Sequence, residues 1–86
     1  MGAHIIVYRT ESCPYCVAAK QLLQKRGYEF EEVYLDRDAS RMAELKEQFG
    51  WRTVPMIVVG DTFVGGYTDL RQLDTAGTLA QLVGTP

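Results

Sequence analysis

Two cysteines three positions apart, Cys13 and Cys16, are the residues of this sequence whose spacing points most directly to chemistry. They enclose Pro14 and Tyr15 at the predicted start of a helix, where unpaired backbone N–H groups and the helix dipole favour an anion. A thiolate on Cys13 is stabilised there, with Arg9 adding positive potential, and the thiolate is the nucleophile of thiol–disulfide exchange. Cys16 lies one turn further on, where it can attack a mixed disulfide on Cys13. The spacing therefore predicts a redox-active pair.

Three other interpretations of the pair compete with redox exchange. A structural zinc site needs four ligands, and beyond the cysteines the sequence has a single soft donor, His4. Two buried structural thiols are the second alternative, although a helix start after a polar loop is partly exposed. The third is an iron–sulfur cluster shared across a dimer. Redox exchange accounts best for the position of the pair.

The elements that position the thiols follow from the apolar pattern. Residues 4–8 are β-branched and aromatic and predict a buried strand, and residues 14–26 predict a helix with Pro14 in its first turn. The apolar face of that helix is expected to be formed by Val17, Ala18, Leu22 and Leu23. The strand therefore delivers the chain to a polar loop that ends at Cys13.

Further along, the same patterning predicts three more strands and two more helices. In chain order they are a strand at 28–35, a helix ending at residue 50, two strands at 56–59 and 62–64, and a helix from 68 to about 82. Gly60 and Asp61 separate the last two strands, as is typical of a hairpin with a type II′ turn. The order β-α-β-α-β-β-α predicts a single α/β domain over residues 1–86, with a mixed four-stranded sheet flanked by helices.

Composition excludes several classes of function. The 86 residues are 47% hydrophobic and carry nine basic and eleven acidic side chains, for a net charge of −2. A chain without a concentrated basic surface is a poor nucleic-acid binder. The longest apolar run, residues 54–59, is far shorter than the roughly 20 residues of a membrane-spanning helix. With no leader pattern and too few cysteines for a disulfide framework, we expect a soluble, cytoplasmic protein with no nucleic-acid or membrane partner.

Two further segments carry weaker signals. In Thr53-Val54-Pro55, the proline restricts its predecessor to extended geometry and permits a cis peptide bond. After the last strand, Gly65-Gly66-Tyr67-Thr68-Asp69 joins two glycines, which let a backbone approach a ligand closely, to a hydroxyl and a carboxylate at a helix start. Taken alone, the first segment is better interpreted as an ordinary proline at a strand start, and the second is equally well interpreted as a plain turn with a helix cap.

In order and spacing, however, the three segments together resemble the glutaredoxin family, and the Cys-Pro-Tyr-Cys tetrad is typical of its small bacterial dithiol members. The resemblance covers residues 5–82 and implies a thioredoxin-like fold, with glutathione as the reductant. It implies that Cys13 is the nucleophile that takes the glutathionyl group and that Cys16 is the resolving thiol. No metal or organic cofactor is implied, since glutathione serves as co-substrate.

The resemblance also implies a glutathione site. Arg9 would contact the glycine carboxylate, Tyr15 would line the groove, and Asp69 would oppose the ammonium of the γ-glutamyl group. The remaining expected residues are Thr53 and Val54 as backbone partners, Pro55 as a cis proline, Gly66 for room, and Thr68 beside Asp69. Met42 stands where the family often has a polar side chain, which leaves Arg41 or Arg52 as a further candidate for the carboxylate. Trp51 has two interpretations: it packs on the surface, which we prefer, or it borders the site and reports the redox state by its fluorescence.

The function predicted is a monomeric, glutathione-dependent thiol–disulfide oxidoreductase acting on glutathionylated or disulfide-bearing proteins. Two alternatives remain at this point. One is a redoxin fed by thioredoxin reductase that donates electrons to ribonucleotide reductase. The other is an iron–sulfur cluster binder, in which Cys13 and glutathione would be ligands in a dimer.

Overall fold

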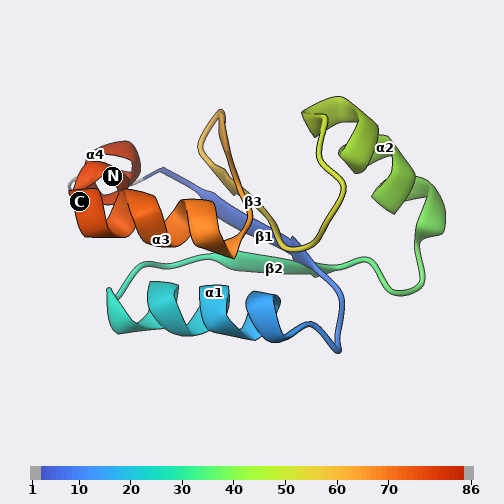
Figure 1. The fold of residues 1–86 in the computed structure, drawn as a ribbon, viewed down its shortest axis with the longest axis horizontal. Coiled ribbons are helices and arrows are strands. Elements are labelled where there is room, and N and C mark those ends of the chain that lie inside the picture. The colour runs from blue at the N-terminus through green and yellow to red at the C-terminus, as the bar shows by residue number, and fades with distance from the viewer. Residues whose placement is uncertain (1–2, 85–86) are drawn as a thin grey trace.

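The computed structural model describes residues 3–84, so residues 1–2 and 85–86 of the expected domain lie outside the described part (Figure 1). Strands and helices alternate through most of the chain. In order they are β1 (Ile5–Arg9), α1 (Pro14–Lys25), β2 (Glu31–Tyr34), α2 (Ala39–Phe49), β3 (Met56–Val59), β4 (Thr62–Gly65), α3 (Tyr67–Ala76) and α4 (Thr78–Val83). None of these helices is long and apolar enough to cross a membrane, a finding that applies to residues 3–84.

The four strands form one mixed sheet, as the sequence predicts, and their order in it is β2-β1-β3-β4. β1 runs parallel to β2 and antiparallel to β3, and β3 and β4 form an antiparallel hairpin. The register pairs Tyr8 with Met56, so the residue before β3 lies beside the end of β1. It also pairs Ile57 with Gly65, so the end of β4 lies at the same edge. The sheet therefore gathers three loops, those after β1, before β3 and after β4.

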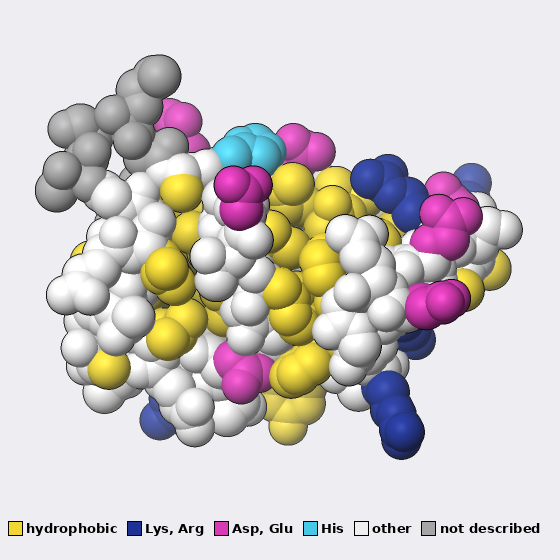
Figure 2. All heavy atoms as spheres, turned by 90° about the horizontal axis from the view of Figure 1, so that it is seen from above, with side chains coloured by type: hydrophobic (Ala, Val, Ile, Leu, Met, Phe, Trp, Pro, Cys, Tyr) yellow, Lys and Arg dark blue, Asp and Glu magenta, His cyan; other side chains and the backbone are white. Residues whose placement is uncertain are grey.

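Side chains alternate between the two faces of the sheet and form two apolar clusters. One face packs against α1, α3 and α4, which lie together in Figure 1. Its buried members are Ile5, Val7, Ala19, Leu23, Ile57, Val59, Leu70, Leu79 and Val83. The other face packs against α2 through Tyr8, Leu35, Leu45 and Met56. Partly buried hydrophobic residues border this second cluster. Figure 2 shows apolar side chains gathered on the face of the molecule that is seen in that view.

Three local expectations were wrong. The final helix is broken at Gly77, whose φ of 81° lies in the left-handed region and ends α3 before α4 begins. β2 is four residues long because the segment before Glu31 makes no ladder pairs. Val17 is 41% exposed, since the buried face of α1 runs through Cys16, Ala19 and Leu23 at helical spacing. Apolar residue type alone did not identify the buried face.

The hairpin turn agrees with its prediction. Gly60 has a φ of 60°, and no non-glycine residue among residues 3–84 has a positive φ. A type I′ turn would need positive φ at both central residues, so the turn is of the type II′ class. The tight connection fixes the register of β3 against β4 and with it the position of the loop after β4.

Candidate functional site

Cys13 is the N-cap residue of α1, with extended backbone at φ −127° and ψ 104°. Its Sγ accepts a hydrogen bond from the backbone N–H of Cys16 at 3.2 Å. Pro14 occupies the first helical position, where the missing N–H removes no hydrogen bond. The sulfur therefore faces a free helix N-terminus, where backbone donors and the helix dipole stabilise a thiolate.

Cys16 shares that turn of helix but has a different environment. Its side chain is fully buried, whereas Cys13 is 9% exposed, and both are free thiols. Burial, followed by the hydrogen bond with Cys13, raises the pKa of the Cys16 thiol from 9.0 to about 12. Cys13 thus has a slightly exposed sulfur at the N-terminus of α1, whereas Cys16 has a buried, neutral thiol in the first turn of that helix.

The segment before β3 faces the first sulfur. The Val54–Pro55 peptide bond is cis, as the resemblance implies. The Cys13 thiol donates a long hydrogen bond to the Val54 carbonyl oxygen, with Sγ and O 3.7 Å apart. The β1–β3 register explains this approach, because it places Pro55 beside the loop that carries Cys13.

A groove of about 360 Å³ adjoins these segments. It brings together seven of the residues expected from the sequence, and these are Tyr15, Thr53, Val54, Pro55, Gly66, Thr68 and Asp69. Tyr67 and Trp51 complete the lining. The rings of Tyr15 and Tyr67 stack with centroids 6.3 Å apart, which joins the start of α1 to the start of α3. The groove is therefore walled by segments from three separate parts of the chain.

Asp69 lines this groove and also lies in the first turn of α3. Its Oδ2 accepts the backbone N–H of Gly66, the N-cap residue, at 3.0 Å. Thr68, expected near the cap, lies within the first turn. Of the two adjacent glycines, Gly65 is the one that a side chain could not replace without strain. Its φ is 118°, and an added Cβ would lie 2.6 Å from Asp69 Oδ2. At Gly66 the nearest atom to such a Cβ would be 3.8 Å away, an ordinary contact.

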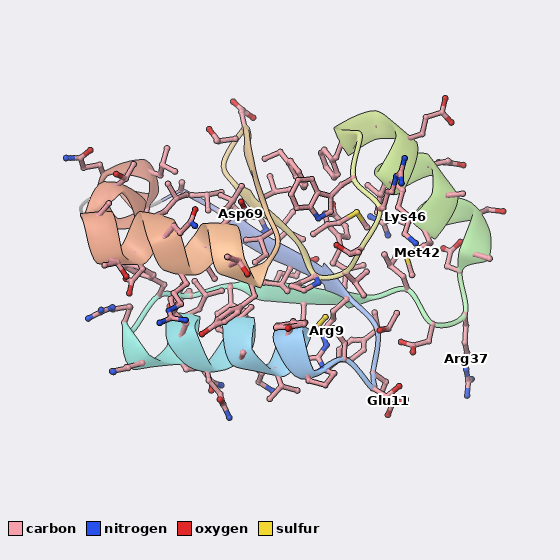
Figure 3. All side chains as sticks on the ribbon, in the orientation of Figure 1. Arg9, Glu11, Arg37, Met42, Lys46 and Asp69 are labelled. Carbon is pink, nitrogen blue, oxygen red and sulfur yellow. The ribbon has the colours of Figure 1, made fainter. Side chains whose placement is uncertain are left out.

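The structure places Arg9 outside the groove, contrary to expectation. Only 4% of Arg9 is exposed, and its Nη1 donates to Glu32 Oε2 at 2.7 Å. The guanidinium also donates to the backbone carbonyls of Thr10 and Glu11 and lies over the Tyr34 ring. In Figure 3 Arg9 lies between the sheet and the start of α1, away from Asp69. Because side chains alternate along a strand, the last residue of β1 faces α1 rather than the groove.

Other cations lie nearer the opposite side of Cys13. A second hollow of about 560 Å³ is lined by Thr10, Ser12, Leu35, Asp36, Ala39, Met42, Ala43 and Lys46. Met42 and Lys46 come from one stretch of α2 (Figure 3). Arg41 lies over the Tyr8 ring at 5.7 Å, and Arg52 is exposed next to Thr53. Lys46 thus lines a hollow that includes Ser12, and Arg52 is an exposed cation next to a groove residue.

Of the two further groove residues, Tyr67 was not identified from the sequence, and Trp51 was considered but not preferred as a site residue. Trp51 lines the groove and packs edge-on against Phe63 at 5.4 Å, which agrees with the less favoured interpretation that it borders the site. Its buried Nε1 makes no hydrogen bond with residues 3–84. Tyr67 gave one signal, an aromatic residue directly after two glycines. Between residues 3 and 84, no group of three or more His, Cys, Asp or Glu side chains could hold a metal ion.

Comparison with known proteins gives a consistent result. The family description "Glutaredoxin" matches residues 5–64. A protein named glutaredoxin from Pseudomonas aeruginosa is 46% identical over 79 residues, which are 92% of this chain and 94% of that protein. Glutaredoxin 3 of Escherichia coli K12 is 38% identical over 81 residues, or 94% of this chain and 98% of that protein.

Solved structures agree in fold. The solution structure of glutaredoxin from Brucella melitensis superposes with a TM-score of 0.85 at 38% identity, covering 95% of this chain and 89% of that one. A crystal structure described as a buckwheat glutaredoxin–glutathione complex gives a TM-score of 0.88 at 26% identity, covering 92% and 74%. The expected thioredoxin-like arrangement of a mixed sheet flanked by helices is thereby confirmed.

Proposed function

Since the chain belongs to the glutaredoxin family of thiol oxidoreductases, we propose that it uses glutathione to reduce protein–glutathione mixed disulfides and protein disulfides. One observation carries the proposal. The Cys13 sulfur lies at a helix N-terminus and 3.7 Å from the Val54 carbonyl oxygen, beside a groove whose lining includes Asp69. A groove next to the nucleophile can bind a short, extended thiol compound such as glutathione.

The charges of the groove suit the two ends of glutathione. Asp69 would pair with the ammonium of the γ-glutamyl group, and the free N–H groups at the start of α3 would bind its carboxylate. Thr53 and Val54 offer extended backbone to the central cysteine. Lys46 or Arg52 would attract the glycine carboxylate, in place of Arg9, which is occupied by Glu32.

The first route needs Cys13 alone. Its thiolate attacks the glutathione sulfur of a protein–glutathione disulfide, and the protein leaves as a thiolate that takes a proton from water. Cys13 then carries the glutathionyl group. The thiolate of a second glutathione attacks the glutathione sulfur of that adduct. This attack yields glutathione disulfide and regenerates the Cys13 thiolate.

The second route reduces a protein disulfide and needs both cysteines. Cys13 forms a mixed disulfide with the substrate, Cys16 displaces the substrate, and a Cys13–Cys16 disulfide remains for glutathione to reduce. The 3.2 Å contact between Cys13 Sγ and Cys16 N keeps the two residues within one helical turn. We further propose that the protein acts as a cytoplasmic monomer with no resident metal.

A coupled assay tests the proposal. Wild type, Cys13→Ser and Cys16→Ser are given a glutathionylated peptide, glutathione, glutathione reductase and NADPH. We expect Cys16→Ser to keep turnover and Cys13→Ser to lose it. Loss of turnover in both variants, or turnover fed by thioredoxin reductase in place of glutathione, would contradict the proposal. A coloured, cluster-bearing dimer after anaerobic iron–sulfur reconstitution would favour the cluster-binding alternative instead.

A further inference from the structure

Arg9 is a buried charge that the groove does not use. A buried arginine is costly unless it is paired, and its partner is Glu32, 2.7 Å away. Glu32 also lies 3.6 Å from the ammonium of Lys20, measured from Oε1 to Nζ. Two cations thus share one carboxylate, and the group formed by Arg9, Lys20 and Glu32, here called the basic cluster, carries one net positive charge.

The basic cluster borders the resolving thiol from two elements. Cys16 and Lys20 stand four residues apart on α1 and so lie on the same face of the helix. From β1, the Arg9 guanidinium donates to the Thr10 carbonyl in the loop that leads to α1. Figure 3 shows Arg9 at the start of α1, the part of the helix that contains Cys16. Because Cys16 is fully buried, water screens little of the field between them.

We propose that Arg9, held by Glu32 and assisted by Lys20, is a positioning residue that stabilises the thiolate of Cys16 and so sets the rate of the two-cysteine route. The inference rests on the proposed function, because it concerns a step of that second route. Electrostatic attraction to Arg9 also opposes the rise that burial imposes on the pKa of Cys16. The one-cysteine route does not use Cys16 and should not depend on the basic cluster.

The affected step is the resolution of a mixed disulfide. The Cys16 sulfur attacks the Cys13 sulfur, the bond between Cys13 and the substrate sulfur breaks, and the Cys13–Cys16 bond forms. Cys16 is oxidised, the substrate sulfur is reduced to a thiol, and the proton lost from Cys16 ends on that departing thiol. During this step the Cys16 sulfur carries negative charge as a thiolate. The net positive charge of the basic cluster lowers the energy of that thiolate.

The test measures this step alone. The reduced chain is mixed rapidly with excess 2-hydroxyethyl disulfide, which forms a mixed disulfide with 2-mercaptoethanol at Cys13 and frees one 2-mercaptoethanol, and release of the second 2-mercaptoethanol by Cys16 is followed in a single turnover. We expect Arg9→Gln to slow release by about three- to tenfold, since exchange rates follow thiol pKa with a slope of roughly one half. Arg9→Lys, which keeps the charge, should recover most of the rate. Arg26→Gln, which removes an exposed arginine paired with Asp74 near the far end of α1, is the matched control.

Glu32→Gln separates an electrostatic role from a structural one. Removal of its negative charge makes the basic cluster more positive, so release should become faster, whereas loss of a merely structural ion pair would slow it. Lys20→Gln, on a side chain that is 38% exposed, should slow release by about twofold and decides the question if a buried variant fails to fold. An unchanged rate in Lys20→Gln and Arg9→Gln, or slower release in Glu32→Gln, would overturn the proposal.

A second arm keeps this test separate from the proposed function. In the Cys16→Ser background, turnover of glutathionylated peptide should be the same with and without the Arg9→Gln substitution, and a fall there would also overturn the inference. The mixed disulfide with 2-mercaptoethanol needs no recognition of glutathione. If the chain proved not to use glutathione, the resolution step could still be measured, and the two failures would be distinguishable.

Discussion

At the scale of single residues, the two cysteines differ more in environment than in position. They are three residues apart, yet Cys13 lies at the N-terminus of α1 with part of its surface exposed, and Cys16 is fully buried. Only a thiol that reaches the solvent can meet a bulky disulfide, so Cys13 is the sulfur able to attack first. Cys16 can act once a mixed disulfide has formed above it.

The buried thiol should make the stability of the reduced protein depend on pH. In the folded state the pKa of Cys16 is raised from 9.0 to about 12, mainly by burial. Its contribution to folding is fully present below pH 9 and is lost as pH rises toward 12, by about 1.4 kcal/mol per pH unit. Urea unfolding of the reduced wild type and of Cys16→Ala, from about pH 8 to about pH 10, measures this difference. Parallel pH profiles for the two proteins would show that Cys16 is not the cause.

A second residue-scale prediction concerns Asp69. An asparagine there still accepts the Gly66 N–H that caps α3, but it removes the charge proposed to meet the ammonium of glutathione. We expect Asp69→Asn to raise the KM for glutathione by about tenfold, the value of one charged hydrogen bond, with little loss of stability. Asp61→Asn, at the exposed hairpin turn, is the control for net charge. Equal KM values in the two variants would exclude a role for Asp69 in binding.

Arg9 and Asp69 show what could and could not be predicted for the site. The family resemblance implied that Asp69 is a groove residue, within a local pattern of glycines followed by a helix start, and Asp69 lines the groove. The resemblance also implied Arg9, which lies four residues before Cys13, but strand alternation turns its side chain to the other face. Closeness in sequence predicted well which side chains lie near each other within a turn or at a helix start. It predicted this poorly at the end of a strand, where successive side chains point to opposite faces of the sheet.

At the scale of elements, the loop between β4 and α3 depends on Gly65, whereas of the two adjacent glycines the sequence analysis assigned Gly66 to the site. We expect Gly65→Ala to destabilise the protein by about 1–3 kcal/mol, because its φ of 118° disfavours a side chain and the new Cβ would meet Asp69. Gly66→Ala, one position along, has room for a Cβ and should cost much less. Urea unfolding of both variants measures the difference. If Gly65→Ala were as stable as Gly66→Ala, the loop would not be constrained as described.

Elements bounded by strong local signals were predicted best. β3 matches its predicted bounds because turn residues mark it on both sides, and α2 ends at Gly50 as expected. The break at Gly77 was missed because leucines continue at helical spacing through α3 and α4. Whether a glycine interrupts or merely weakens a helix depends on packing against the rest of the fold, which a local pattern does not contain.

At the scale of the whole molecule, the sheet register brings the site together. Pairing of Tyr8 with Met56 and of Ile57 with Gly65 sets Cys13, Pro55 and the start of α3 at one edge of the sheet. The mixed four-stranded sheet was predicted from the element order, and the family resemblance implied seven of the nine residues that line the groove. Trp51 and Tyr67 enter it only because the loops that carry them converge in three dimensions.

The most direct test of the central claim is the location of the glutathionyl group on the protein. Wild type, Cys13→Ser and Cys16→Ser, of which the two variants keep one cysteine each, are treated with glutathione disulfide, and the modified residue and the extent of modification are measured by mass spectrometry of the intact and digested proteins. For Cys16→Ser we predict one glutathionyl group per chain, on Cys13, which added glutathione removes completely, and for Cys13→Ser far less modification. An unmodified Cys13, or an adduct that glutathione cannot remove, would contradict the account.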